Sequence, residues 1–221
     1  MKSIYEFLLK SKTAVSTQDT DYVDLGLPSG LLWATCNIGA DKPYEYGDYF
    51  MWGSTTPTTN KRCDWQYAPF NDGHLVFNEK YFKSIQDNIC TNDVLAPKYD
   101  AATQIWGDEW RMPKAKECRE LINNTTYEWA TKYKGIDVNG LLFKSKTNDA
   151  ELFIPAGGYR NGSIFNFQGS YVYLWSSSLY TSIPEYAICM LSTASHGNIN
   201  DIDIVFIQRM TATNIRAVRD R

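Results

Sequence analysis

The chain has 221 residues, of which 43% are hydrophobic and 21% are charged, a balance that supports a buried core and excludes overall disorder. The net charge of −3 gives no electrostatic basis for nucleic-acid binding, so we expect no nucleic-acid partner. We predict an N-terminal helical segment with its linker over residues 1–19 and one globular domain over residues 20–221.

The N-terminal segment carries a helical pattern. Ile4, Phe7 and Leu8 fall at i, i+3 and i+4, which predicts a short amphipathic helix over residues 2–10. A helix of this length is not stable alone, so it must pack on the domain, on a second copy or on a larger assembly. Glu6 interrupts the apolar run, so we predict no signal peptide.

The globular part opens with a predicted hairpin over residues 22–34, in which a Pro/Ser/Gly turn joins two short strands. Residues 54–78 are irregular, and helices are predicted at about residues 79–89 and 97–103. No later stretch is long and apolar enough to cross a bilayer. We therefore expect synthesis in the cytoplasm and no membrane insertion.

The clearest helix signal follows Pro113, which can occupy the first turn of a helix. Cys118, Leu121 and Ile122 give this helix an apolar side, and the helix is predicted to end at residues 123–125.

The remaining chain has the residue pattern of β-strands joined by turns. Asn139 and Gly140 suit a type I′ hairpin turn, residues 147–150 form a second predicted turn, and residues 152–160 read as a strand that runs into a glycine bend. Strands, then helices, then a long β half predict an α+β domain.

The last fifty residues contain the predicted contact face. Residues 180–213 have no Lys and no Trp, and the last Lys of the chain is Lys146; Lys is depleted at interfaces. Strand alternation predicts that about half of the candidate residues point outward. The candidate ligand-binding residues are Tyr173, Tyr180, Ile183, Tyr186, Ile188, Asn200, Asp201, Asp203, Val205, Phe206, Gln208, Met210, Thr211 and Thr213.

Six blocks of the chain occur in the order of a known family. They are VDLGLPSGLLWA (residues 23–34), PYEYGDYFMWG (43–53), WRMP (110–113), IPAGGYR (154–160), WSSS (175–178) and IRAV (215–218). With these blocks the chain resembles the Fibrobacter succinogenes major paralogous domain of gut Bacteroidetes and their phages. The resemblance covers residues 22–218.

The resemblance implies a C-type-lectin-like fold with two helices that flank small antiparallel sheets. It also implies kinship with the variable proteins of diversity-generating retroelements, in which mutagenesis rewrites surface residues near the C-terminus. Randomised AAC codons yield Tyr, Ser, Thr, Ile, Asp, His, Phe, Val and Asn but never Lys, Glu or Trp, and residues 180–213 nearly keep to that alphabet, with Glu185, Gln208 and Met210 as departures. The implied function is recognition of a surface protein or glycan by a phage or prophage adhesin, mounted on a virion through the N-terminal helix.

Two other classes of function stay open. A structural protein could self-associate through the same face. An enzyme related to the formylglycine-generating enzymes would need a close cysteine pair late in the chain, where only Cys189 occurs, and the two histidines, His74 and His196, lie in different regions. We therefore expect a protein without catalytic activity and without a cofactor.

Several polar residues have a structural interpretation that we prefer. Asn198, Asn200, Asp201 and Asp203 could bind Ca²⁺ through oxygens, but a solvated acidic loop is the simpler reading, so no metal site is predicted. Trp175 is expected to be buried. We expect buried ion pairs or carbonyl contacts for the framework arginines Arg111, Arg160 and Arg216.

Overall fold

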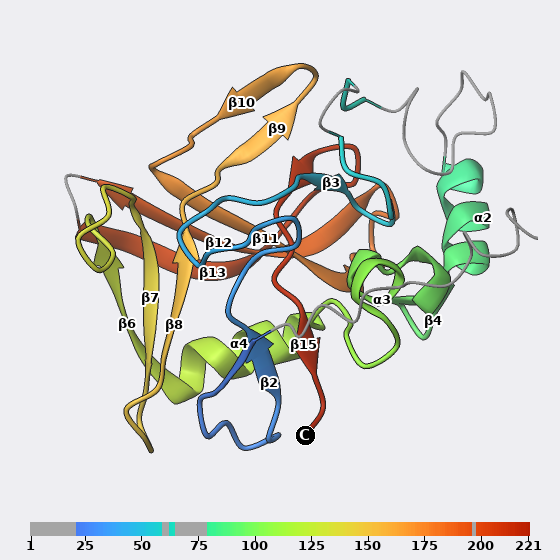
Figure 1. Cartoon of the computed structure of the whole chain (residues 1–221). Coiled ribbons are helices and arrows are strands. Elements are labelled where there is room, and N and C mark those ends of the chain that lie inside the picture. Colours follow the sequence, from blue (N-terminus) through green and yellow to red (C-terminus); the bar gives the residue numbers. More distant parts are fainter. Residues whose placement is uncertain (1–20, 59–61, 65–78, 196–197) are drawn as a thin grey trace, which may run out of the picture.

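The computed structural model describes residues 21–58, 62–64, 79–195 and 198–221 (Figure 1). The helix predicted over residues 2–10 and its linker lie outside these residues. Within the described residues the fold is α+β, as predicted, with three α-helices and four small antiparallel sheets. The helices are α2 (Glu79–Ile89), α3 (Ala101–Trp106) and α4 (Ala115–Asn124), with a 3₁₀ turn η2 (Pro97–Tyr99) before α3.

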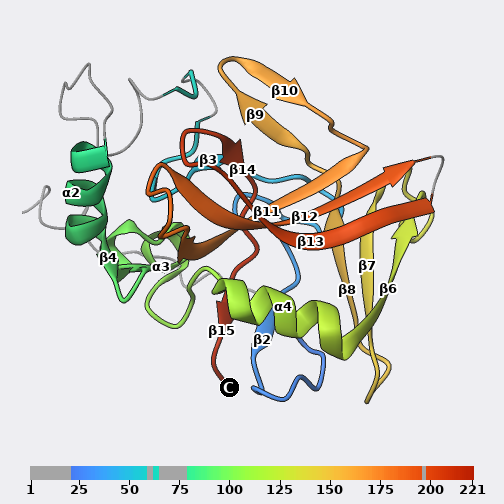
Figure 2. The same cartoon turned by 180° about the vertical axis from the view of Figure 1, so that it is seen from behind.

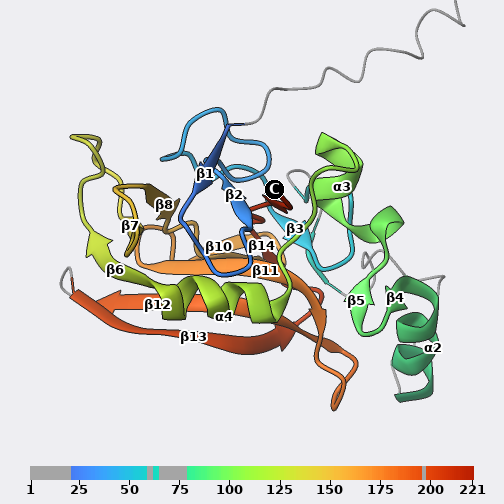
Figure 3. The same cartoon turned by 90° about the horizontal axis from the view of Figure 1, so that it is seen from below.

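A five-stranded sheet in the order β13-β12-β11-β5-β4 is the centre of the molecule. Its long strands are β11 (Tyr171–Leu179), β12 (Tyr186–Ser195) and β13 (Asn198–Gln208), and its short ones are β4 (Cys90–Thr91) and β5 (Val94–Leu95). Helix α4 lies across one face of β11, β12 and β13 (Figure 3). We call this the α4 face and the other side the opposite face.

Three smaller sheets surround the central one (Figures 1 and 2). The first, β1-β2-β15, consists of β1 (Tyr22–Asp24), β2 (Leu32–Ala34) and β15 (Val218–Arg219) and so brings the two ends of the described chain together. The second, β6-β7-β8, consists of β6 (Thr125–Ala130), β7 (Gly140–Ser145) and β8 (Glu151–Pro155). The third, β10-β9-β14-β3, consists of β9 (Tyr159–Asn161), β10 (Ile164–Asn166), β14 (Ala212–Thr213) and β3 (Phe50–Met51).

The central strands have buried side chains on both faces. On the α4 face, Leu174 lies opposite Met190 in the register of β11 and β12, and both pack with Leu121 of α4. On the opposite face, Trp175 lies opposite Cys189, and both belong to a second core cluster. Full burial of one such apolar side chain stabilises a fold by about 1.5–3 kcal/mol. The middle of β11 and β12 is therefore a buried support for the surfaces around it.

Two predicted elements are confirmed with the predicted limits. Residues 22–34 form the β1–β2 hairpin, in which Tyr22 lies opposite Ala34, and residues 79–89 form α2. The helix predicted over residues 97–103 is divided into η2 and α3. The division falls at Asp100, whose carboxylate accepts hydrogen bonds from the Ala102 and Thr103 backbone N–H groups and so starts a new helix.

Two predicted boundaries are wrong. Pro113 is not in the first turn of α4, because the helix begins after Lys114, where the Glu117 carboxylate accepts the Lys114 N–H at 2.7 Å. Asn139 and Gly140 do not form a tight turn, because Gly140 is the first residue of β7. A Cβ at Gly140 would lie 2.4 Å from the Ile154 carbonyl oxygen, so packing against β8, and not turn geometry, requires glycine there.

The framework arginines make the contacts that the sequence predicted. Arg216 is fully buried and donates to the carbonyl oxygens of Ala34 and Thr35 and to Asn37 Oδ1. The side chain of Arg160 donates to the Thr58 carbonyl oxygen. These contacts join the C-terminal region to segments from the first third of the chain.

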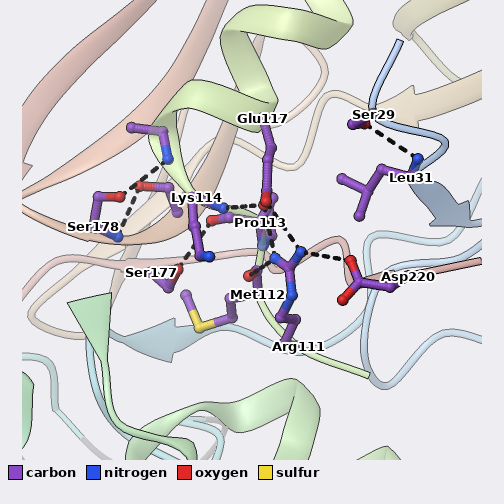
Figure 4. A network of polar contacts seen from close by, with 12 residues as sticks. Ser29, Leu31, Arg111, Met112, Pro113, Lys114, Glu117, Ser177, Ser178 and Asp220 are labelled. Carbon is purple, nitrogen blue, oxygen red and sulfur yellow. Dashed lines mark hydrogen bonds and ion pairs between the residues drawn. The ribbon is translucent and has the colours of Figure 1, made fainter. Parts of the chain in front are cut away.

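Arg111 fixes the start of α4 to the end of the chain (Figure 4). Its guanidinium donates to both carboxylate oxygens of Glu117, at 2.7 and 3.0 Å, and to Asp220 at 3.1 Å. Bidentate pairs of this kind are among the stronger hydrogen bonds in proteins. The helix that supports the α4 face is therefore held at its N-terminus.

Candidate ligand-binding surfaces

The predicted contact residues do not form one face, because alternation along β11, β12 and β13 divides them. Tyr173 and Asp203 are on the opposite face, since each lies across from Leu191 in the register of its strand pair. Tyr186 and Gln208 lie across from each other on the α4 face, as do Ile188 and Phe206. Two separate surfaces result.

The first surface, which we call the aromatic surface, is on the opposite face where β11 begins. It is built from β9, β10, the loop after β10, and β11 and β12, and Figure 1 shows the β9–β10 hairpin standing over the central sheet. Its members are Tyr159, Ile164, Phe167, Tyr171, Tyr173 and Leu191.

The rings of the aromatic surface contact one another. Phe167 stacks on Tyr171 with ring centroids 4.5 Å apart, and Tyr159 meets Tyr173 edge to face at 5.1 Å. Tyr171 and Tyr173 are 6.3 Å apart. Such pairs contribute about 0.5–1.5 kcal/mol beyond the area that they bury. The rings therefore hold each other in place.

These side chains are nevertheless open to solvent. Ile164 is 67% exposed and Phe167 is 50% exposed, while Tyr159, Tyr171 and Tyr173 are half-buried. The pKa of Tyr173 is raised from 10.0 to about 12, chiefly by burial, with further contributions from Cys189, Tyr159 and Tyr171. The cluster of rings is thus accessible, and Tyr173 stays protonated at physiological pH. The exposed Asp203 lies beside it, across from Leu191.

The backbone of the loop after β10 is strained at Phe167, and this conformation places the Phe167 ring on the aromatic surface. Phe167 has φ +58°, a conformation that costs an L-residue about 1–2 kcal/mol. Gly158 has φ +62°, and a Cβ there would lie 2.0 Å from the Asn166 carbonyl oxygen. Tyr49 secures the loop, because its hydroxyl donates to the Gly157 carbonyl oxygen at 2.6 Å and accepts from Gln168 Nε2 at 2.9 Å.

The second surface, which we call the distal cluster, is on the α4 face where β11 ends and β12 begins. Tyr180 stacks on Phe206 with centroids 4.1 Å apart and an interplanar angle of 6°, and Tyr186 meets Phe206 edge to face at 5.7 Å. Phe206 is 46% exposed. The members of the distal cluster are Tyr180, Tyr186, Ile188, Phe206 and Gln208. The predicted residue Ile183 is exposed in the turn between β11 and β12.

The remaining predicted residues fall outside both surfaces or are buried. Thr211 and Thr213 are buried and cannot contribute to an exposed face, because Thr213 pairs with Phe50 in an inner sheet. Val205 packs partly against the core, and Met210 is half-buried after the end of β13. The side chains of Asn200 and Asp201 lie outside the described residues.

Sequence reasoning missed the contribution of the β9–β10 hairpin. Tyr159, Ile164 and Phe167 precede residue 171, where the predicted contact face began. A signal was present, since a short polar-flanked segment between Gly162 and Gly169 carries the apolar residues Ile164, Phe165 and Phe167. β10 is the outer strand of its sheet, so large apolar side chains on it and on the loop after it are covered on fewer sides than those of an inner strand.

Metal-ligating groups and reactive thiols were the next candidates for a site in the described residues. No group of three or more His, Cys, Asp or Glu in them is placed to hold a metal ion. Burial raises the pKa of the Cys118 thiol to about 12 and also raises that of Cys189, so both thiols stay protonated and weakly nucleophilic. Trp175 is fully buried, as predicted, and its Nε1 donates to the Phe50 carbonyl oxygen at 2.9 Å.

A cavity of about 240 Å³ lies beside the start of α4 and is lined by Asp100, Arg111, Lys114 and Ser177, among others. Its polar groups largely contact protein. Asp100 accepts three backbone N–H groups, and Arg111 is paired with Glu117 and Asp220. Of these lining residues, Arg111, Lys114 and Ser177 belong to the network of polar contacts in Figure 4.

Comparison of the chain with protein-family models, curated proteins and solved structures found no match. In the part of the chain that the structure describes, no helix has the length and apolar character needed to cross a membrane.

Proposed function

We propose that this protein recognises a surface receptor, protein or glycan, through the aromatic surface and without covalent chemistry. The observation that carries the proposal is the contiguous group of partly exposed rings Tyr159, Phe167, Tyr171 and Tyr173 on a rigid sheet. Tyr offers a large contact area and a hydroxyl at a low cost in side-chain entropy, which is why it is frequent in binding sites.

We further propose that the α+β arrangement is a C-type-lectin-like fold and that the chain is a relative of the Fibrobacter succinogenes major paralogous domain. The positions of the six framework blocks support this. Their large side chains Trp33, Trp52, Trp110 and Trp175 and the guanidinium of Arg216 are all buried. A family framework should lie in the core, while the residues between the blocks should be free to vary.

The proposed role includes diversification of strands β12 and β13 by a retroelement. The exposed positions there, such as Asp203 and Phe206, tolerate substitution because they point away from the core. Sequencing of the DNA around this reading frame tests this part of the proposal. A template repeat and a reverse transcriptase gene should be adjacent, and their absence would remove it without affecting the aromatic surface.

Binding to intact cells of a panel of gut Bacteroidetes strains, and to an array of bacterial glycans, tests the proposed function. We expect Tyr171→Ala to reduce binding by at least about tenfold, since loss of a central aromatic contact costs 1–2 kcal/mol or more. Ile105→Ala is the matched control, because Ile105 is exposed on α3, away from both surfaces. Equal binding by both variants and the unmodified protein would refute the proposal.

A further inference from the structure

Strand β13 is the outer edge of the central sheet. The order β13-β12-β11-β5-β4 gives it one neighbour, β12, among the described strands, and Figure 3 shows it along the margin of the molecule. It is eleven residues long. Proteins usually protect such edges with Pro, charged side chains, bulges or a covering segment. Residues 198–208 contain no Pro and no Lys; their charged residues are Asp201 and Asp203, and the register shift of β13 lies before Asp201, so the stretch from Ile204 to Gln208 has none of these devices.

The direction of the backbone groups follows from two hydrogen bonds. The Arg209 N–H donates to the Glu185 carbonyl oxygen, on the β12 side, so the N–H groups of odd-numbered residues in this strand point inward. The Ile204 N–H instead donates to the Asp203 carboxylate at 2.6 Å, so even-numbered residues point outward. In an antiparallel ladder the N–H and C=O groups of one residue point to the same side. The Ile204 and Phe206 backbones therefore face the open edge.

The side chains beside this edge are apolar. Phe206 is 46% exposed and Ile204 is half-buried, and both lie on the α4 face next to the distal cluster. Val205 and Ile207 are half-buried on the opposite face. Asp203 is the only charged residue among residues 202–208. Outward backbone groups between apolar side chains favour pairing with another strand over hydration.

We propose that β13 pairs with β13 of a second copy of this chain, in antiparallel orientation about a two-fold axis at Val205. In this register Ile204 lies opposite the Phe206 of the other copy. The Ile204 N–H leaves the Asp203 carboxylate, and Ile204 and Phe206 exchange both backbone hydrogen bonds. The pair occurs twice by symmetry. The two central sheets then form one continuous sheet of ten strands.

The register explains why the occupant is a second copy. Aromatic and β-branched side chains placed opposite each other contribute about 0.2–1 kcal/mol per pair, and two Ile204–Phe206 pairs form. Asp203 lies opposite Ile207 of the other copy, so its carboxylate does not face a second carboxylate. The dimer leaves the aromatic surface on the other side of the sheet open, and two such surfaces then point to the same side.

Sedimentation equilibrium of the full chain tests the pairing. We expect a dimer at micromolar concentrations for the unmodified protein and a monomer for Ile204→Pro, which removes an outward N–H but none of the bonds to β12. Far-UV circular dichroism of Ile204→Pro should be unchanged. If this variant does not fold, Phe206→Lys, which places a charge at the apolar edge, should also be a monomer.

Two controls separate this edge from other contacts. Ile164→Lys alters the aromatic surface and should remain dimeric. A dimer that persists in both Ile204→Pro and Phe206→Lys but dissociates in Phe7→Glu would assign association to the N-terminal segment and overturn the proposal. A monomeric unmodified protein at 100-fold higher concentration would overturn it equally.

Discussion

The aromatic surface and the distal cluster are both made of stacked rings, but their backbone surroundings differ. The rings of the aromatic surface belong to β9, β11 and the loop after β10. Near these rings β11 pairs with β12 on one side, and on the other side the Tyr171 carbonyl oxygen accepts the Gly158 N–H and the Trp175 N–H donates to the Asn214 carbonyl oxygen. Phe206 of the distal cluster lies on β13, whose outer edge has no described neighbour. For this reason we propose side-chain recognition at one place and strand pairing at the other.

Substitution of Trp175 should affect both surfaces at once and give the largest effect. Trp175 lies between them in β11, is fully buried and donates to the Phe50 carbonyl oxygen. We expect Trp175→Ala to lower the free energy of unfolding by about 3–5 kcal/mol, measured by urea denaturation. Tyr22→Ala, at a site that is 49% exposed, should change it by less than about 0.5 kcal/mol. Equal effects of the two substitutions would contradict the core described here.

Removal of the Glu117 charge should affect the α4 face more than the aromatic surface. Glu117→Gln breaks the bidentate pair with Arg111. Because the Arg111 side chain is 26% exposed, we expect a loss of only about 1–2 kcal/mol. Amide hydrogen exchange should become faster in α4 before it changes in β9 and β10. Uniform acceleration across both regions would show that the two faces are not independent.

Phe167→Gly should separate stability from binding. Glycine relieves the strain of φ +58°, by about 1 kcal/mol, while loss of the ring removes a stacking contact of similar size. The free energy of unfolding should therefore change by less than about 1 kcal/mol in urea titrations, although binding to cells should fall. A large loss of stability would mean that Phe167 belongs to the core and not to a contact surface.

A smaller effect should be visible in the titration of Tyr173. Its folded-state pKa is about 12, above the ordinary value of 10.0, so the folded protein holds this proton after the unfolded chain has lost it. Its contribution to stability is present below pH 10 and is lost as the pH rises from 10 to 12. Tyr49 behaves similarly. Absorbance titration of tyrosinate should show one late-titrating tyrosine fewer in Tyr173→Phe, and an unchanged late phase would contradict this assignment.

The sequence was sufficient for local elements with strong signals. The β1–β2 hairpin and α2 were predicted with their limits, and the burial of Trp175 followed from its size and setting. It was misleading at Gly140, where a glycine required by packing looked like a turn residue.

The candidate surfaces could be predicted only in part. Alternation of side chains along the strands was expected. Whether the odd- or the even-numbered residues are exposed depends on the bulge between Trp175 and Leu179 and on what covers each face of the sheet. Thr213 was predicted on the contact face because it belongs to the Lys-free stretch of residues 180–213. In the structure it is buried, because it pairs with Phe50 in the sheet of β14 and β3. The approach of the β9–β10 hairpin to β11 is a long-range contact that no local pattern encodes.

Hydrogen–deuterium exchange of the protein bound to a cell-surface target, found with the strain panel or the glycan array, tests the central claim most directly. We predict slower exchange in β9, β10, the loop at Phe167 and the start of β11, with β13 unchanged relative to the free protein at the same concentration. Protection that spared these segments and appeared only at the distal cluster or elsewhere would contradict the assignment of recognition to the aromatic surface.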